Sequence, residues 1–404
     1  MTDSTRELFL KILSFEKCER TLRWEMGYWN ETLIRWYKEG LPKIKGLPGN
    51  APITNESSFG PAIYLWSKSY VDEKRDQTVN YDVSNCFNFD EGYLKFPYNY
   101  WLYPRFDEKI IFEDDNSIEF YGSDGIKRKN LKESTSMPMW IEWPVKNRKD
   151  WEIIKEDRFN FNTIDKRFYG ILDNYIKKNN NRTAPLILFD APCGFFGSLR
   201  TLIGENNLYF FYYDNPNLLK DIINHLLNLW LLIAEELTSK IDFDIACFFE
   251  DMAGKNGSLI SPSIFKEFMS PCYKKLINFL KSKGIKYFFM DCDGKLDELI
   301  PLFLEVGFNV IYPVERQAGN DLLKLRKEYP QLRIMGGFDK NTLYKGKEYI
   351  NRELELITPL IKDGGYIPFA DHLIPPNSSW ENFRYYREKL NEIINSTKVR
   401  NKEN

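Results

Sequence analysis

The chain has 404 residues, of which 43% are hydrophobic and 28% charged, and its formal net charge is −2. This composition is typical of a soluble globular protein with enough apolar residues for a large core. Because the charge is nearly balanced and no block of lysine or arginine occurs, we expect no nucleic-acid partner. The six cysteines lack CxxC spacing, which argues against a disulfide framework or a thiolate zinc knuckle.

The first 60 residues are rich in aromatic side chains and are predicted to form a helical arm. They begin with MTDSTRELFLKILSFEK, an amphipathic stretch with charges throughout. It has neither the apolar core of a signal peptide nor the length of a membrane-spanning helix, so we expect a cytoplasmic protein without a membrane contact. Residues 80–135 are predicted to form an extended insertion, because IIFEDDNSIEFYGSDGIKRK alternates and turns like a β-hairpin or short meander.

From about residue 184 the chain repeats a short apolar run, a polar or glycine-bearing turn and an amphipathic helix. The runs, each predicted to be a strand, are LILFDA (186–191), DIACFFED (244–251), KYFFMDCD (286–293), NVIYPVE (309–315), RIMGGFD (333–339) and YIPFAD (366–371). Such runs indicate parallel strands covered by helices. Six units over residues 184–390, without a GxGxxG turn, favour an α/β fold of the (β/α)8 TIM-barrel type. Residues 1–395 would form this single domain, and residues 396–404 a disordered tail.

Capping residues predict where several helices begin and end. Ser261 is typical of a helix start, and Gly284 is typical of the end of the same helix. The segment KNTLYKGKEYINRELELITPLIK also has helical character, although Gly346 and Pro359 weaken a single unbroken helix.

Each of the six predicted strands ends in an acidic residue. These residues are Asp190, Glu250 with Asp251, Asp291 with Asp293, Glu315, Asp339, and Asp371 followed by His372. Because strand ends converge on one face of a barrel, they predict an acidic bowl. Carboxylates that lie close together raise one another's pKa unless nearby positive charges neutralise them. The candidate cations are Arg20, Arg23, Arg200, Lys255, Arg316 and Lys340. The alternative for any single acid is a structural role as a helix cap or ion-pair partner.

Two aspartates and one histidine are the strongest candidates for chemistry within this bowl. Period-two alternation places Asp291 and Asp293 on one face of their strand and Cys292 on the other. His372 follows the last predicted strand, where its ring suits acid–base catalysis or metal binding, with a loop hydrogen bond as the alternative. The second histidine, His225, lies inside a predicted helix and is expected to pack against its neighbours.

Six blocks of sequence together carry a family resemblance. They are RTLRWEMGYWNETLIRWYKEGLP (20–42), WIEWPVKNRKDWE (140–152), FFEDMAGKNGSLISPSIFKEFMSPCYKKL (248–276), MDCDGKLDELIPLFLEVGFNVIYPVERQAGND (290–321), MGGFDKNTLYKGKE (335–348) and GGYIPFADHLIPPNSSWENFRYY (364–386). In this order they resemble the uroporphyrinogen decarboxylase superfamily over about residues 15–390. The resemblance implies a (β/α)8 barrel enzyme, either a cofactor-independent decarboxylase of tetrapyrroles or a methyltransferase that works with a corrinoid.

The decarboxylase branch binds propionates through arginines of an N-terminal arm that reads close to RQAGRY. Here the matching region is RTLRWEMGYW, so Arg20 and Arg23 match as anion-binding arginines but the QAGR core is missing. An octacarboxylate substrate needs several cationic partners, and the acidic bowl opposes such a substrate. Decarboxylation of uroporphyrinogen or another polycarboxylate is therefore the second hypothesis.

The thiol-methylating branch binds zinc through a His-x-Cys pair and a later cysteine. At the matching strand end, Asp291 takes the histidine position and Asp293 the cysteine position, and PFADH stands where the later cysteine is expected. A thiolate-rich zinc site is therefore not expected. A divalent metal such as zinc, if one is bound, would be held by Glu250, Asp291, Asp293 and His372.

The combined expectation is a methyltransferase that moves a methyl group from a small methoxylated or methylated substrate to a corrinoid. The corrinoid would be carried by a separate partner protein, because this chain has no DxHxxG signature. The expected catalytic residues are Asp291, Asp293, His372 and Glu250. The expected substrate-binding residues are Arg20, Arg23, Trp24, Asp251, Glu315, Asp339 and Asp371. A homodimer is typical of the superfamily, and a non-catalytic binding barrel is the third hypothesis.

Overall fold

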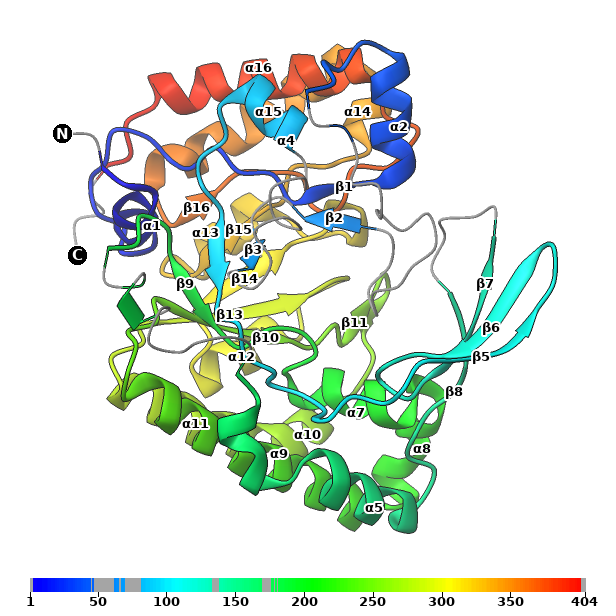
Figure 1. Cartoon of the computed structure of the whole chain (residues 1–404). Helices are drawn as coiled ribbons and strands as arrows, with labels where there is room; N and C mark the ends of the chain where they lie inside the picture. Colours follow the sequence, from blue (N-terminus) through cyan, green and yellow to red (C-terminus); the bar gives the residue numbers. More distant parts are fainter. Residues whose placement is uncertain are drawn as a thin grey trace.

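The computed structural model describes residues 3–44, 46, 62–64, 67–69, 81–132, 138–168, 176–177, 179 and 181–400. In these residues eight strands form one parallel sheet, which curls through the middle of the molecule (Figure 1) in the order β16-β15-β14-β13-β10-β9-β4-β3. The strands in chain order are β3 (Ser67–Ser69), β4 (Tyr93–Lys95), β9 (Leu186–Leu188), β10 (Ile245–Phe249), β13 (Tyr287–Cys292), β14 (Val310–Pro313), β15 (Arg333–Met335) and β16 (Tyr366–Ile367).

The two faces of the sheet contribute to different hydrophobic clusters. On β10, Ile245 and Cys247 belong to an inner cluster, whereas Ala246 and Phe248 belong to an outer cluster that includes the helices. This division follows from the strand, in which successive side chains point to opposite faces. Because both faces are buried, the strands read as continuous apolar runs, and all six runs predicted from the sequence are strands.

Helices that follow the strands cover the outer face of the sheet (Figure 1). They are α9 (Pro216–Thr238), α11 (Ser270–Ser282), α12 (Ile300–Val306), α13 (Leu322–Glu328), α15 (Lys347–Asp363) and α16 (Trp380–Ser396). Ser261 caps the predicted helix start through the N–H of Ile264, but this helix consists of α10 (Pro262–Ile264), a π-helical segment (Phe265–Met269) and α11.

Gly346 divides the long predicted helix into α14 (Thr342–Lys345) and α15, because its φ of 106° is incompatible with a continuous helix. Pro359 lies inside α15 and does not end it.

The N-terminal region contributes to the inner cluster. Helix α1 (Thr5–Leu13) buries Phe9 and Leu13 there and meets β16 through a 3.0 Å hydrogen bond from the N–H of Gly365 to the carbonyl of Ile12. The chain then runs beside β16, where the Thr21 hydroxyl donates to the Tyr366 carbonyl at 2.8 Å. It continues into β1 (Gly27–Trp29), which pairs with β2 (Ala62–Tyr64), and into α2 (Asn30–Lys38).

The predicted insertion is a separate antiparallel sheet of four strands among the described residues. They are β5 (Lys109–Glu113), β6 (Ser117–Tyr121), β7 (Lys127–Leu131) and β8 (Met139–Glu142), and the sheet projects from the main body (Figure 1). The insertion differs from its predicted bounds of 80–135 at both ends. Helix α4 (Tyr81–Phe87) and β4 precede it, and β4 belongs to the parallel sheet; β8 extends it to residue 142.

The end of the chain departs from the predicted disordered tail. Val399 is buried and forms an antiparallel bridge with Cys18, and the N–H of Arg400 donates to the Lys362 carbonyl at 2.9 Å. Residues 397–400 are therefore packed against the body, because Val399 completes the inner cluster beside α1. Residues 401–404 lie outside the described part of the chain.

No helix of the described residues combines the length and the apolar character that a bilayer crossing requires.

Candidate active site

Asp291 lies at the end of β13 and is the central residue of the candidate site. Its register partners are Phe249 on β10 and Tyr312 on β14, so an aromatic residue flanks it on each neighbouring strand. Alternation places Asp291 on the same face as Phe289, which belongs to the inner cluster. Cys292 points to the outer cluster, as the alternation predicts, and its sulfur accepts a hydrogen bond from the N–H of Met252 at 3.3 Å.

Asp293 and His372 form an ion pair that joins the ends of two distant strands. The distance from His372 Nε2 to the Asp293 carboxylate is 3.4 Å. Burial disfavours ionisation of Asp293, but His372, Lys340 and Arg200 outweigh it and lower the pKa of this aspartate. Burial likewise disfavours the charged imidazole, but Asp293 outweighs it and raises the pKa of His372. The pair therefore favours an ionised carboxylate beside a protonated imidazole.

Lys340, which follows β15, forms ion pairs with two further acidic residues that the sequence predicted for the site. Its Nζ lies 3.2 Å from the Glu315 carboxylate and 3.7 Å from that of Asp371. Asp371 is fully buried and accepts hydrogen bonds from the N–H groups of Arg316 and Lys340 at 2.8 and 3.0 Å. Burial raises the pKa of Asp371 to about 6. Asp371 therefore ties the loops after β14 and β15 together and does not hold His372 directly.

Asp251 pairs with Arg200 of α7 (Phe195–Ile203). The guanidinium lies 2.6 Å from the carboxylate and also donates to the Asp251 carbonyl at 3.1 Å. The backbone of Asp251 has a φ of 49°, a left-handed conformation that aspartate tolerates better than most side chains. Burial, with the charge of Asp293 added, raises the pKa of Asp251.

Lys95 is a site residue that the sequence analysis missed. It ends β4, and its Nζ lies 2.6 Å from the carboxylate of Asp190, which follows β9. The short run YLK lies inside the segment predicted to be an insertion, so it was not expected to be a strand of the sheet. Had the segment been treated as a strand, the lysine at its end would have been a further candidate beside the strand-end acids.

Asp291 differs from the other strand-end acids because its carboxyl group has neither a cationic partner nor a hydrogen-bond donor among the described residues. No hydrogen bond or ion pair joins its carboxyl group to another described residue. Burial raises its pKa well above the usual range, and the charges of Asp293, Asp251 and Asp190 add to this effect, while Lys95 opposes it. A proton or a bound cation would compensate the charge of Asp291.

Glu250 does not lie in this cluster, contrary to the expectation from the sequence. Its side chain points to the outer side of β10, is fully buried and accepts hydrogen bonds from the N–H groups of Phe195 and Gly197 at 2.9 and 2.8 Å. The Tyr273 hydroxyl donates to the same carboxyl group. Glu250 therefore caps the first turn of α7, whose N-cap residue Gly194 has no side chain to do so.

A metal site built from Glu250, Asp291, Asp293 and His372 is not supported, because Glu250 faces away from the other three. In the part of the chain that the structure describes, no group of three or more His, Cys, Asp or Glu side chains is arranged to hold a metal ion. Zinc requires at least three such protein ligands in a catalytic site, so these residues do not fit it.

The predicted substrate-binding residues of the N-terminal region lie elsewhere. Arg20 and Arg23 both contact the carboxylate of Asp90, at 2.6 and 3.2 Å. Asp90 precedes β4, so these groups lie where the strands begin, whereas Asp291 lies where β13 ends. Trp24 is fully buried in the inner cluster, and its indole N–H donates to the Glu91 carbonyl at 2.9 Å. The structure does not bring these residues to Asp291.

Asp339 also makes local contacts after β15. Its carboxylate accepts hydrogen bonds from the Gln317 side chain at 2.7 Å and from the N–H of Asn341 at 2.9 Å. These bonds join the loop after β14 to the start of α14 and so shape the rim of the site.

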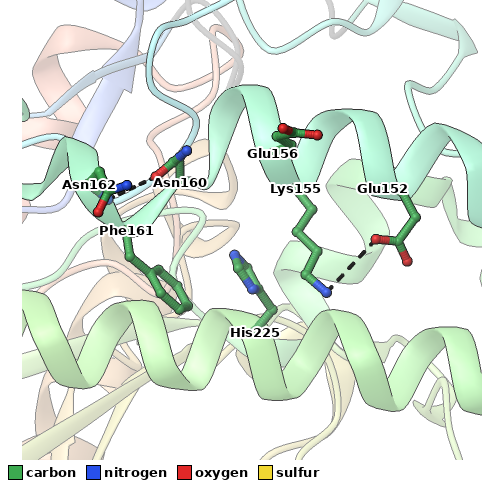
Figure 2. Close-up of a pocket in the computed structure, with 7 residues that line it drawn as sticks. All are labelled: Glu152, Lys155, Glu156, Asn160, Phe161, Asn162 and His225. Atoms are coloured by element: carbon green, nitrogen blue, oxygen red, sulfur yellow. Dashed lines mark hydrogen bonds and ion pairs between the residues drawn. The ribbon is translucent and has the colours of Figure 1, made fainter.

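An open pocket of about 400 Å³ lies away from these residues, between α5 (Arg148–Arg158) and α9 (Figure 2). Within it His225 stacks on Phe161, with ring centroids 4.6 Å apart, and its Nε2 lies 2.9 Å from the carbonyl of Phe159. Burial lowers the pKa of His225. The packing role predicted for this histidine is confirmed.

A curled parallel sheet with charged residues gathered at the carboxyl ends of its strands is the arrangement of α/β-barrel-type enzymes. The uroporphyrinogen decarboxylase (URO-D) family profile matches residues 140–393. The match covers more than half of the chain, and the chain therefore belongs to the URO-D family.

Comparison with curated proteins returned no match. One similar solved structure is a B12-independent methionine synthase from Shewanella sp. W3-18-1 in complex with selenomethionine. It has 14% sequence identity and a TM-score of 0.36, over 56% of this chain and 67% of that chain.

Proposed function

We propose that this protein is a cytoplasmic methyltransferase of the URO-D family, which takes a methyl group from a small methoxylated or methylated substrate. The observation that carries the proposal is Asp291, a carboxyl group without a partner among the described residues and with a strongly raised pKa. We further propose that the sheet closes into a (β/α)8 barrel, with Asp291 at its mouth. A perturbed carboxyl group in such a position is typical of a functional site.

Removal of a methyl group from a methoxyl oxygen requires that the leaving oxygen be stabilised. A methoxyl oxygen that loses its methyl group carries negative charge, and a protonated Asp291 can donate a proton to it. The ion pair of Asp293 and His372 lies next to Asp291 and would orient the substrate by charge and hydrogen bonding. Phe249, Phe289 and Tyr312 would exclude water around the reacting atoms.

The methyl acceptor would be a corrinoid on a separate partner protein, which supplies the nucleophile when it docks over the carboxyl ends of the strands. The residues of this chain bind the methyl donor, exclude water and hold the proton at Asp291. No step is assigned to a metal, because the predicted ligands do not converge.

Decarboxylation of an octacarboxylate is less compatible with the charges of the site. Lys95, Arg200 and Lys340 are each paired with a carboxylate, and Arg20 and Arg23 share Asp90. A polyanionic substrate would have to break these pairs before it could use their charges.

The test is a methyl-transfer assay with cob(I)alamin and a panel of methoxylated and methylated donors, followed by the absorption change that accompanies methylation of the corrinoid. We expect turnover with at least one donor and a loss of at least about a hundredfold in Asp291→Asn, because a positioned general acid contributes about that much. Asp107→Asn, the same chemical change at an exposed position before β5, should keep full activity. Inactivity with all donors, together with carbon dioxide release from uroporphyrinogen, would contradict the proposal.

A further inference from the structure

The N-terminal region contacts the segment of the chain that carries His372. Residues 21–29, which lead from α1 to β1, run beside residues 366–374 and in the same direction (Figure 1). Because β16 is the last strand in the order of the sheet among the described residues, residues 21–29 lie along its outer edge. The pairs in contact along this edge are Thr21 with Tyr366, Glu25 with Ala370, and Tyr28 with Ile374.

The contact at Ala370 is made by a side chain. On the side of β15, the N–H of Asp371 donates to the Phe338 carbonyl at 2.7 Å, and the N–H of Phe338 donates to the Phe369 carbonyl at 3.0 Å. Because successive N–H groups of a strand point to opposite edges, the N–H of Ala370 points away from β15. There it donates to the Glu25 carboxyl group at 2.9 Å. A buried N–H without an acceptor is costly, so Glu25 supplies what this edge requires.

Glu25 is itself held from two sides. The oxygen that accepts from Ala370 also accepts from the N–H of Met26 at 3.1 Å, and the other oxygen lies 3.3 Å from Arg387 of α16. The side chains of Glu25 and Arg387 are both fully buried. The guanidinium also donates to the Trp24 carbonyl at 3.0 Å. The carboxyl group of Glu25 therefore has a fixed place between α16 and the edge of β16.

His372 lies between two points that the N-terminal region fixes. Ala370 comes two residues before it, and Ile374 comes two residues after it and donates its N–H to the Gly27 carbonyl at 3.0 Å. The ring of His372 lies 3.4 Å from the carboxylate of Asp293. Since the attraction between charges falls with distance, a displacement of this short segment would weaken that pair.

We infer that the N-terminal region positions His372, and that Glu25 is the positioning residue: its carboxyl group fixes the backbone at Ala370 and thereby holds the imidazole beside Asp293. The N-terminal region thus has a part in the candidate site that its two arginines do not have. The part of His372 in catalysis rests on the proposed function, whereas the position of its ring does not.

Two variants of Glu25 separate the position of its carboxyl group from its charge. Glu25→Asp keeps the charge but is one methylene shorter, so it cannot reach both Ala370 and Arg387. Glu25→Gln keeps the length and an oxygen that accepts from Ala370 but has no charge. Burial raises the pKa of Glu25 although Arg387 opposes this effect, so the neutral amide also suits the position.

The measurement is an NMR titration of the two imidazoles of the whole protein, with His225 as the internal reference. In Glu25→Asp we expect the pKa of His372 to fall towards or below the usual 6.5, because burial then acts on a ring that has moved away from its anion. In Glu25→Gln the pKa of His372 should stay at its raised value. The pKa of His225 should be the same in all proteins.

Two threonines provide matched controls. Thr21 and Thr32 are both fully buried, and each hydroxyl donates at 2.8 Å to a backbone carbonyl, that of Tyr366 and that of Ile374 respectively. Thr21→Val removes the bond far from His372 along the chain and should leave its pKa unchanged. Thr32→Val removes the bond at Ile374 and should lower this pKa, which decides the question if the aspartate variant does not fold.

An unchanged pKa of His372 in a folded Glu25→Asp, or in Thr32→Val if the aspartate variant is unfolded, would overturn the inference. So would an equal fall in Glu25→Asp and Glu25→Gln, since it would show that the charge of Glu25 acts on His372. The titration contains neither methyl donor nor corrinoid. An unchanged pKa in a protein that transfers methyl groups would therefore refute the positioning role alone, and the expected shift in a protein without methyl transfer would refute the proposed function alone.

Discussion

At the scale of single residues, the two histidines of this chain occupy opposite electrostatic environments. His372 lies beside an ionised aspartate, which raises its pKa although burial acts against it. His225 is packed between aromatic rings, its Nε2–H donates to the Phe159 carbonyl, and burial lowers its pKa. The neighbours of the same side chain therefore favour its charged form in one place and its neutral form in the other.

This difference can be measured directly, because the sequence contains only two histidines. We predict two imidazole titrations in the NMR spectrum, one with a pKa above the usual 6.5 and one below it. In Asp293→Asn the higher pKa should fall, since burial then acts on His372 without its anionic partner, while the lower pKa should stay unchanged. An unchanged higher pKa in this variant would show that Asp293 does not control His372.

At the scale of elements, helix α7 depends on a carboxyl group from a neighbouring strand. Glu250 satisfies two N–H groups of its first turn, and Arg200 from the same helix holds Asp251 in the candidate site. Gly194 and Gly197 allow this close approach, because a Cβ atom at either position would lie 2.1 or 2.4 Å from the Phe249 carbonyl oxygen. The cap of α7 thus positions a charged pair of the site through the helix.

Glu250 should also make stability depend on pH. Burial raises its pKa from 4.5 to about 7, so the folded state favours the protonated form. The stabilisation from proton uptake is fully present below pH 4.5 and is lost as the pH rises through about 7.

Glu250→Gln imitates the protonated form at every pH, and we predict that its stability relative to the unmodified protein increases between pH 5 and pH 8, by roughly 1 to 3 kcal/mol. Urea unfolding at both pH values measures this difference. A difference between the two proteins that does not change with pH would show that Glu250 does not take up a proton on folding in this pH range.

At the scale of the whole molecule, the inner cluster is closed by a helix from the start of the chain. Phe9 of α1 is almost fully buried, and its ring lies 5.7 Å from that of Trp24 in the same cluster. Val399, near the other end of the chain, completes this cluster. Both ends of the described chain therefore stabilise the end of the sheet opposite Asp291.

Removing this packing should cost stability without altering the site. We predict that Phe9→Ala lowers the free energy of unfolding by roughly 3 to 5 kcal/mol, because it leaves a cavity in a closed core. Ile153→Ala, on the half-exposed face of α5, should change it by less than about 0.5 kcal/mol. Urea unfolding measures both values. A loss in Phe9→Ala no larger than that in Ile153→Ala would show that α1 does not close the core.

The sequence predicted those features that depend on neighbouring residues along the chain. The apolar runs identified six strands, and alternation within β13 correctly separated Asp291 from Cys292. The same alternation, applied to β10, would have shown that Glu250 points outward. The position of Glu250 at a strand end favours the opposite prediction, because it ignores the face to which the side chain points.

The sequence by itself determined the parallel α/β fold, the family and the presence of acids at the strand ends, because these follow from local periodicity and from the order of sequence blocks along one chain. Only the tertiary structure decided which acid meets which cation. Asp293 pairs with His372, Lys340 with Glu315 and Asp190 with Lys95, and each pair joins residues from different strand ends. Such pairing depends on the direction of side chains across the curled sheet. It leaves Asp291 without a partner among the described residues.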